Sequence, residues 1–135
     1  MRRHLGDGAP ADRKDAWHMM AAASGNQVLN GFGMWAAEEK ATGHLIGRIG
    51  LYQPPHFPDL EVNWLLGRQW WGKSLAHEGA MACIDRAFTR LDRPTISAFI
   101  ASVNERSIRL ARRLGMIEVG EPWPGVHQFQ RGRQI

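Results

Sequence analysis

The sequence predicts a single α+β domain in which a mixed, mostly antiparallel sheet is flanked by helices. Three observations lead to this fold class. Residues 62–66 form an apolar strand pattern, and a turn with two glycines joins it to a long amphipathic segment that begins near Lys73. Two further strand patterns precede residue 60, which indicates an antiparallel meander. After residue 90, strand and helix patterns alternate, so that residues 1–135 suit one domain with one core.

The N-terminal region is predicted to be a lead followed by a short helix. Residues 1–14 are polar and contain glycines and a proline, so we expect a flexible lead. Asp15 is placed to cap a helix that runs through Ala22, and Gly25 is expected to end it.

The meander is predicted to span residues 32–66. Its first two strands are residues 32–39 and 44–52, joined by a turn at residues 40–43. Residues 53–59 contain three prolines, which cannot continue a sheet ladder, so a loop is expected before the third strand at residues 60–66.

The second half is predicted to form a ligand-binding region, residues 67–119, followed by short C-terminal strands in residues 120–135. Pro94 breaks the chain before a strand at residues 95–100. Asn104 is placed to cap the next helix, which ends at Gly115. The last strands are expected at residues 116–119 and 126–130, around a turn at residues 122–125.

Composition excludes several classes of protein. Hydrophobic residues are 44% and charged residues 22% of the chain, as in an ordinary globular domain. No apolar run approaches the ~20 residues of a membrane span, and no signal peptide is apparent, which predicts a cytoplasmic protein. The single Cys83 fits core packing on the long helix better than a nucleophile. The net charge of +4 comes from dispersed basic residues without interleaved aromatics, which disfavours nucleic acid as a partner.

The turn after residue 66 has the chemistry of a phosphate site. Free backbone N–H groups at a helix start, the helix dipole and two cations, Arg68 and Lys73, converge there. An ordinary helix N-terminus in a turn would look the same from the sequence. The residues expected to contribute are Trp71, Gly72, Lys73, Ser74, Leu75 and Ala76.

Two motifs carry a resemblance to a known family. Residues 69–74, Gln-Trp-Trp-Gly-Lys-Ser, resemble the acetyl-CoA motif of the GNAT superfamily of N-acetyltransferases, with Ser74 in place of the last small residue. Residues 104–116 resemble the superfamily's Asn-x-x-Ser signature, with Met116 in place of its phenylalanine. The resemblance covers residues 32–119. Within it, the sequence of residues 70–80 looks most like the branch that acetylates the N-termini of ribosomal proteins.

The resemblance implies acetyl-CoA as cosubstrate and an amine acceptor. The histidines show no metal-ligand spacing and Cys83 has no partner, so no metal is expected. The resemblance implies that the backbone of Leu65 and Leu66 pairs with pantetheine, that Asn104 contacts the pantetheine amides, and that Ser107 lies near the sulfur. Independently of the resemblance, Arg109 or Arg113 of the same helix is the candidate for the CoA 3′-phosphate, and the alternative is an ordinary solvated arginine on a helix surface. Many relatives carry a tyrosine as general acid where this chain has Ala111, which leaves Ser107 or water to protonate the thiolate.

Glu61 is the candidate general base. Strand alternation puts Glu61, Asn63 and Leu65 on one face, and a carboxylate there can accept the amine proton as the matching acid does in parts of the family. The alternative is a solvated acid at a strand end or a partner for an arginine. The predicted catalytic residues are Glu61, Ser107 and Asn104.

The sequence therefore predicts an N-acetyltransferase that moves the acetyl group of acetyl-CoA directly to a primary amine in a ternary complex. The amine would be a protein N-terminus or a small molecule. The alternative is a CoA-binding or interaction protein of the same fold with impaired catalysis. The family's usual first strand and helix lack a counterpart, so the strand at residues 32–39 would be a bare edge. We expect this edge to be covered by residues 1–14 or by a second copy in a homodimer.

Overall fold

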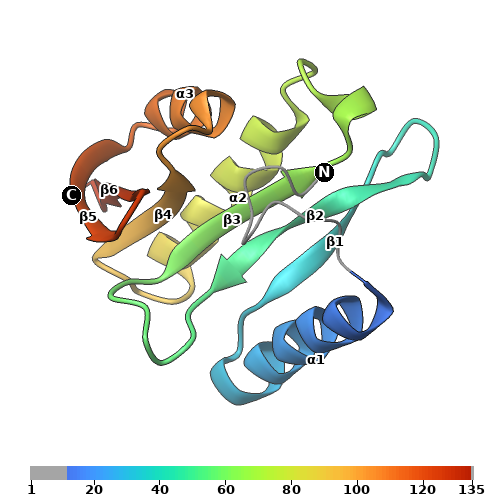
Figure 1. Cartoon of the computed structure of the whole chain (residues 1–135), viewed down its shortest axis with the longest axis horizontal. Coiled ribbons are helices and arrows are strands. Elements are labelled where there is room, and N and C mark those ends of the chain that lie inside the picture. Colours follow the sequence, from blue (N-terminus) through green and yellow to red (C-terminus); the bar gives the residue numbers. More distant parts are fainter. Residues whose placement is uncertain (1–11, 135) are drawn as a thin grey trace.

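The computed structural model describes residues 12–134, which form a six-stranded sheet with three helices (Figure 1). The strand order is β1-β2-β3-β4-β6-β5, and every neighbouring pair is antiparallel except β3 and β4, which are parallel. This confirms the predicted fold class. The elements are α1 (Arg13–Asn30), β1 (Met34–Glu38), β2 (Leu45–Tyr52), β3 (Glu61–Leu66), a 3-10 turn (Arg68–Trp70), α2 (Leu75–Thr89), β4 (Thr95–Ala101), α3 (Glu105–Arg113), β5 (Ile117–Trp123) and β6 (Val126–Gly132).

Helices α2 and α3 cover the same face of the sheet. Gly79 of α2 lies directly against Ile49 of β2, since a Cβ on this glycine would lie 2.5 Å from the Ile49 side chain. Arg131 of β6 contacts both helices, because its guanidinium donates to the Leu114 carbonyl after α3 and to the sulfur of Met81 in α2. We call this side the helical face.

The other side of the sheet carries polar side chains, and we call it the polar face. Arg48, Glu61, Asn63, Ser97, Gln128 and Gln130 share it by strand register. Just before β3, Asp59 ties three strands together on this face. Its Oδ2 accepts from the hydroxyls of Thr95 (3.1 Å) and Ser97 (2.7 Å) in β4 and from the amide of Gln130 (3.3 Å) in β6.

Helix α1 is longer than the sequence analysis predicted. Asp12, rather than Asp15, caps it by accepting the N–H of Asp15 at 2.7 Å, so residues 13 and 14 are helical instead of part of a flexible lead. Gly25 lies inside the helix, because a glycine weakens a helix by about 1 kcal/mol without stopping it. Gly31 ends the helix with φ +76°. The remainder of the predicted lead lies outside the described residues.

The C-terminal hairpin also differs from the prediction. Strand β5 continues through Pro122 and Trp123, which were predicted to lie in the turn. A proline is tolerated there because β5 is the last strand of the sheet and its outer side needs no ladder hydrogen bond. At the opposite edge, β1 is the first strand of the sheet, and its coverage by residues 1–14 or by a second copy stays a prediction.

The close approach of β1 and β2 gives a test of the fold. A Cβ at Gly50 would lie 2.5 Å from the Cα of Met34 and would overlap the Gly33 carbonyl. We therefore expect Gly50→Ala to lower the free energy of unfolding by about 2 kcal/mol in a urea titration. The control is Gly120→Ala in β5, where an added Cβ meets nothing within 4 Å. Equal stability of the two variants would contradict this packing.

Candidate functional site

Strands β3 and β4 part from each other one residue after they meet. Within the described chain they pair at Glu61 and Ser97, where the Ser97 N–H donates to the Leu60 carbonyl at 2.9 Å. Farther along, the N–H of Phe99 donates instead to Oε2 of Glu61 at 3.4 Å. The Glu61 side chain thus takes the place of the next backbone hydrogen bond between the two strands. We call this feature, which Figure 1 shows at the centre of the sheet, the β3–β4 divergence.

The divergence leaves backbone groups of β3 directed toward β4 without a strand partner. Ladder alternation directs the N–H and C=O groups of Val62, Trp64 and Leu66 to this side, while those of Leu65 face β2. The predicted pairing of Leu65 with a ligand therefore conflicts with the register, and Trp64 is the better-placed group. The Leu66 carbonyl lies on the correct side, and it accepts the indole N–H of Trp71 at 2.9 Å.

The Glu61 carboxyl group is almost completely buried, with 4% of the residue exposed. Burial raises its pKa from 4.5 to about 7, because the charged form is poorly solvated there. Hydrogen bonds from Asn63 (2.9 Å to Oε1) and from the Phe99 N–H, and the positive charge of Arg48, favour the charged form and limit the rise. The structure thus excludes the alternative of a solvated acid. A carboxyl group with this pKa changes protonation near neutral pH, as a general base requires.

Asn104 and Ser107 meet on the other side of the divergence. Asn104 caps α3 by accepting the Ser107 N–H at 3.3 Å, and its amide donates to the Ser107 hydroxyl at 3.1 Å. The same hydroxyl accepts the indole N–H of Trp64 at 3.2 Å. Because it accepts both bonds, the Ser107 hydroxyl keeps its own proton available for donation.

The turn before α2 has the geometry of an anion site. Gly72 and Ser74 both adopt left-handed backbone conformations, with φ +75° and φ +60°. Such a conformation costs a residue other than glycine about 1 kcal/mol, so Ser74 is a strained position. The N–H groups of the first turn of α2 have no helical partner until Glu78 donates to the Ser74 carbonyl. Nothing lies within 4 Å of a Cβ built on Gly72, so a ligand can approach the backbone there.

The cations of this turn are arranged around Trp71. The guanidinium of Arg68 lies 5.5 Å from the centre of the Trp71 ring, and that of Arg106 at the start of α3 lies 4.4 Å from it. These contacts connect the turn to α3 through cation–π attraction. Lys73 is exposed next to Gly72.

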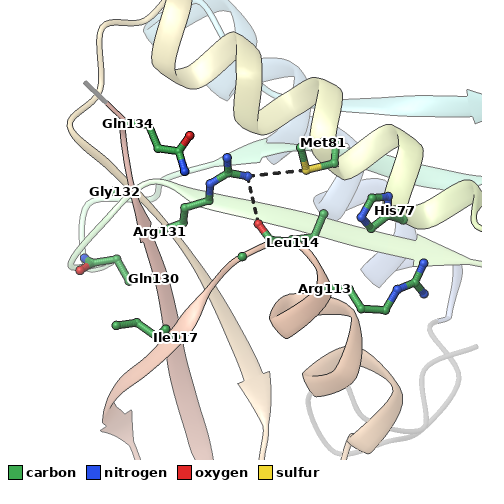
Figure 2. Close-up of a pocket in the computed structure, with 10 residues that line it drawn as sticks. His77, Met81, Arg113, Leu114, Ile117, Gln130, Arg131, Gly132 and Gln134 are labelled. Carbon is green, nitrogen blue, oxygen red and sulfur yellow. Dashed lines mark hydrogen bonds between the residues drawn. The ribbon is translucent and has the colours of Figure 1, made fainter.

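A pocket of about 460 Å³ lies on the helical face, between α2, the end of α3 and the C-terminal hairpin. Figure 2 shows His77 and Arg113 together on one side of it, and Arg131 between Met81 and Leu114. His77 belongs to the first turn of α2, so the pocket begins where the anion site ends. Glu61 does not line this pocket, because it lies on the polar face of the sheet.

The two candidate arginines of α3 differ in their surroundings. Arg109 forms an ion pair of 3.6 Å with Glu105, and 63% of its side chain is exposed. Arg113, one turn later, lines the pocket. The geometry therefore favours Arg113 over Arg109 as the ligand for an anion on this face.

Other candidate chemistries have little support in residues 12–134. This part of the chain has no group of three or more His, Cys, Asp or Glu side chains placed to hold a metal ion. In the same residues, no helix is both long enough and apolar enough to cross a membrane. Cys83 is buried in the core, and burial raises the pKa of its thiol, which disfavours the reactive thiolate.

Comparison with known families identifies the fold's relatives. The family described as acetyltransferase (GNAT) domain matches residues 1–117. The chain belongs to this family. Among proteins with curated sequences, YkkB of Bacillus subtilis is 34% identical over 93 residues. That match covers 67% of this chain, which spans 54% of the length of YkkB.

Several solved acetyltransferase structures are similar to this one. An acetyltransferase from Agrobacterium tumefaciens is 29% identical, with a TM-score of 0.88 over 98% of this chain and 80% of that one. A ribosomal-protein-S5-alanine acetyltransferase from Vibrio fischeri (16% identical, TM-score 0.69, 88% of this chain and 71% of that one) shares the fold. A Vibrio cholerae spermidine N-acetyltransferase in complex with CoA and spermine also shares the fold. It is 18% identical, with a TM-score of 0.71 over 92% of this chain and 78% of that one. The resemblance to the branch that acetylates ribosomal proteins stays a prediction, because a sequence identity as low as 16% shows the shared fold alone.

The buried Glu61 predicts how stability depends on pH. Between pH 4.5 and about 7, the folded protein keeps a proton that the unfolded chain has released, so stability falls as pH rises. Glu61→Gln removes this loss. We expect the variant to be more stable than the wild type at pH 8, by up to about 3 kcal/mol, with the difference shrinking toward pH 4.5.

Urea unfolding at several pH values measures this difference. The matched control is Glu105→Gln on α3, where the side chain is exposed and the pH dependence should follow the wild type. A stability difference for Glu61→Gln that is the same at pH 5 and pH 8 would show that the carboxyl group is not held out of water.

Proposed function

We propose that this protein is an N-acetyltransferase that moves the acetyl group of acetyl-CoA to a primary amine by direct transfer in a ternary complex. The observation that carries the proposal is the placement of Glu61 and Ser107 around the β3–β4 divergence. Glu61 lies on the polar face, whereas Ser107 contacts Trp64 from the helical face. A base and a proton donor on opposite sides of one site suit a reaction in which an amine enters from one side and a thiol leaves on the other.

Acetyl-CoA supplies an activated acyl group with a thiol leaving group. In the transfer, a bond forms between the amine nitrogen and the acyl carbon, and the carbon–sulfur bond breaks. Glu61 accepts the proton that the amine loses, and Ser107 or a water held by it donates a proton to the departing sulfur. Asn104 positions the Ser107 hydroxyl through its amide hydrogen bond.

The residues present fit CoA. The unpartnered backbone groups of Trp64 suit an extended amide-containing chain such as pantetheine. The turn at Gly72 and Ser74 suits the pyrophosphate, because its N–H groups and the dipole of α2 favour an anion. The adjacent pocket with Arg113 has room and positive charge for the phosphorylated adenosine end.

The pH profile of the reaction tests the role of Glu61. Because Glu61 must be ionised to accept a proton, we expect kcat/KM to rise with pH and to level off above about 7. Glu61→Gln should lower turnover by about 10²-fold or more, while the Kd of acetyl-CoA measured by calorimetry stays the same. A midpoint that follows the pKa of each amine tested, instead of staying near 7, would assign proton removal elsewhere.

The alternative of a CoA-binding protein with impaired catalysis is separated by the same measurements. It predicts tight binding of acetyl-CoA without thiol release for any amine acceptor. The feature that favours this alternative is the buried Ala111, which stands where many relatives carry a tyrosine as general acid.

The two arginines of α3 provide a matched test of the CoA site. We expect wild-type protein to bind CoA more tightly than 3′-dephospho-CoA in calorimetry, because Arg113 pairs with the 3′-phosphate. Arg113→Ala should reduce this preference by about tenfold. Arg109→Ala, one turn away, should leave it intact. Loss of the preference in Arg109→Ala alone would place the 3′-phosphate at Arg109, outside the pocket.

A further inference from the structure

Five aromatic side chains gather on the polar face, and the reaction above uses none of them. They are Tyr52 at the end of β2, His56 and Phe57 in the loop before β3, Phe99 in β4 and Trp123 at the end of β5. Phe57 is central, with ring-centre distances of 5.7 Å to Tyr52, 4.9 Å to His56, 5.2 Å to Phe99 and 5.2 Å to Trp123. All five remain partly or largely exposed. We call this group the aromatic cluster.

The aromatic cluster adjoins Glu61. Tyr52 is the direct partner of Glu61 in the β2–β3 register, and directly opposed residues of two strands share a face. Phe99 lies two residues beyond Ser97, which is the partner of Glu61 in β4, and its own N–H donates to the Glu61 carboxyl group. Tyr52 and Phe99 therefore flank Glu61 on two neighbouring strands, and Phe57 packs against both of these rings.

The charges near Glu61 do not suit a polycation. The oxygens of Asp59 already accept one backbone and three side-chain hydrogen bonds. The Glu121 carboxyl group on β5 accepts the Gly125 N–H. Arg48 places a positive charge close enough to Glu61 to affect its pKa. Among the described residues of this region, Glu61 is the carboxyl group that contacts the aromatic cluster directly, through the Phe99 N–H. Each additional ammonium group of a polyamine would need a further carboxylate, and the oxygens of Asp59 are already occupied by four hydrogen bonds.

We propose that the acceptor of this chain is a primary monoamine attached to an aromatic or apolar body. The body packs against Phe57, Phe99 and Trp123, and the nitrogen lies at Glu61. This inference rests on the proposed acetyl transfer and names the substrate class of the same site. Partly exposed aromatic rings provide apolar contact area for the body and favour a cationic nitrogen before it loses its proton.

A matched series of acceptors tests the proposal with the full chain and acetyl-CoA. The amines are 2-phenylethylamine, ethylamine, which lacks the ring, and spermidine, which carries extra charges. In a thiol-release assay we expect kcat/KM for 2-phenylethylamine to exceed that of both others by at least about tenfold. The difference should lie mainly in KM, because the ring contributes binding.

Variants at Trp123 locate the contact. Trp123→Ala should remove most of the preference for 2-phenylethylamine over ethylamine, and Trp123→Phe should keep most of it. Trp17→Ala is the control, because Trp17 is exposed on α1, outside the cluster. Retention of the full preference in a folded Trp123→Ala variant would overturn the proposed contact.

A binding measurement separates this inference from the proposed reaction. In saturation-transfer NMR with CoA-loaded protein, the ring protons of 2-phenylethylamine should receive saturation in the wild type and in Glu61→Gln, and lose it in Trp123→Ala. Binding without acetylation of any amine would refute the acetyl transfer and leave the aromatic site standing. Faster acetylation of spermidine or ethylamine would refute the aromatic acceptor and leave the acetyl transfer standing.

Discussion

The hydrogen bond from the Phe99 N–H to the Glu61 carboxyl group is the interaction on which the site depends. It occupies the place where a parallel ladder would continue from Ser97, so it satisfies a backbone donor while the two strands separate. Burial of the same carboxyl group raises its pKa, and this hydrogen bond favours the charged form and limits the rise. Separation of the strands and tuning of the base are therefore two results of one arrangement.

The positive charge of the chain has a structural use. Arginines stack on aromatic rings at several points, including Arg86 on Trp35, Arg93 on Phe32 and Arg131 on Phe88. Two more, Arg68 and Arg106, meet at Trp71 beside the anion site. Cation–π attraction therefore gives five of the arginines a packing partner within the fold.

The sequence predicted those elements in which a hydrophobic pattern defines the element and a glycine or capping residue marks its end. Strand β3, the turn at Gly72 and the helix capped by Asn104 are found where hydrophobic period, glycine and cap agree. The length of helix α1 was underestimated because Gly25 looks like a terminator, whereas the helix continues to Asn30 and the Asn26 side chain donates to the Phe32 carbonyl just beyond its end. The prediction that the Leu65 backbone pairs with a ligand was wrong in direction. Which backbone N–H and C=O groups face a given neighbour depends on the pairing of two strands, so it cannot be read from one strand alone.

Other features of the site depend on distant parts of the chain. Asn63 could have been recognised as a partner of Glu61, since two residues in a strand share a face. The aromatic cluster could not, because Tyr52, Phe99 and Trp123 are separated by many residues and meet only through sheet order. Arg113 was distinguished from Arg109 by a pocket whose other walls come from α2 and β6.

The ties of Asp59 have a consequence for the dynamics of the sheet. Asp59 lies two residues before β3, and its hydrogen bonds join this end of β3 to β4 and β6. This is the end where β3 and β4 pair. Neither strand can slide past the other without breaking several bonds at once, so their relative motion is restricted to a pivot about this fixed end. One end of the β3–β4 divergence is thereby fixed by the fold, and the conformational entropy of ordering that end is lost during folding, not during binding.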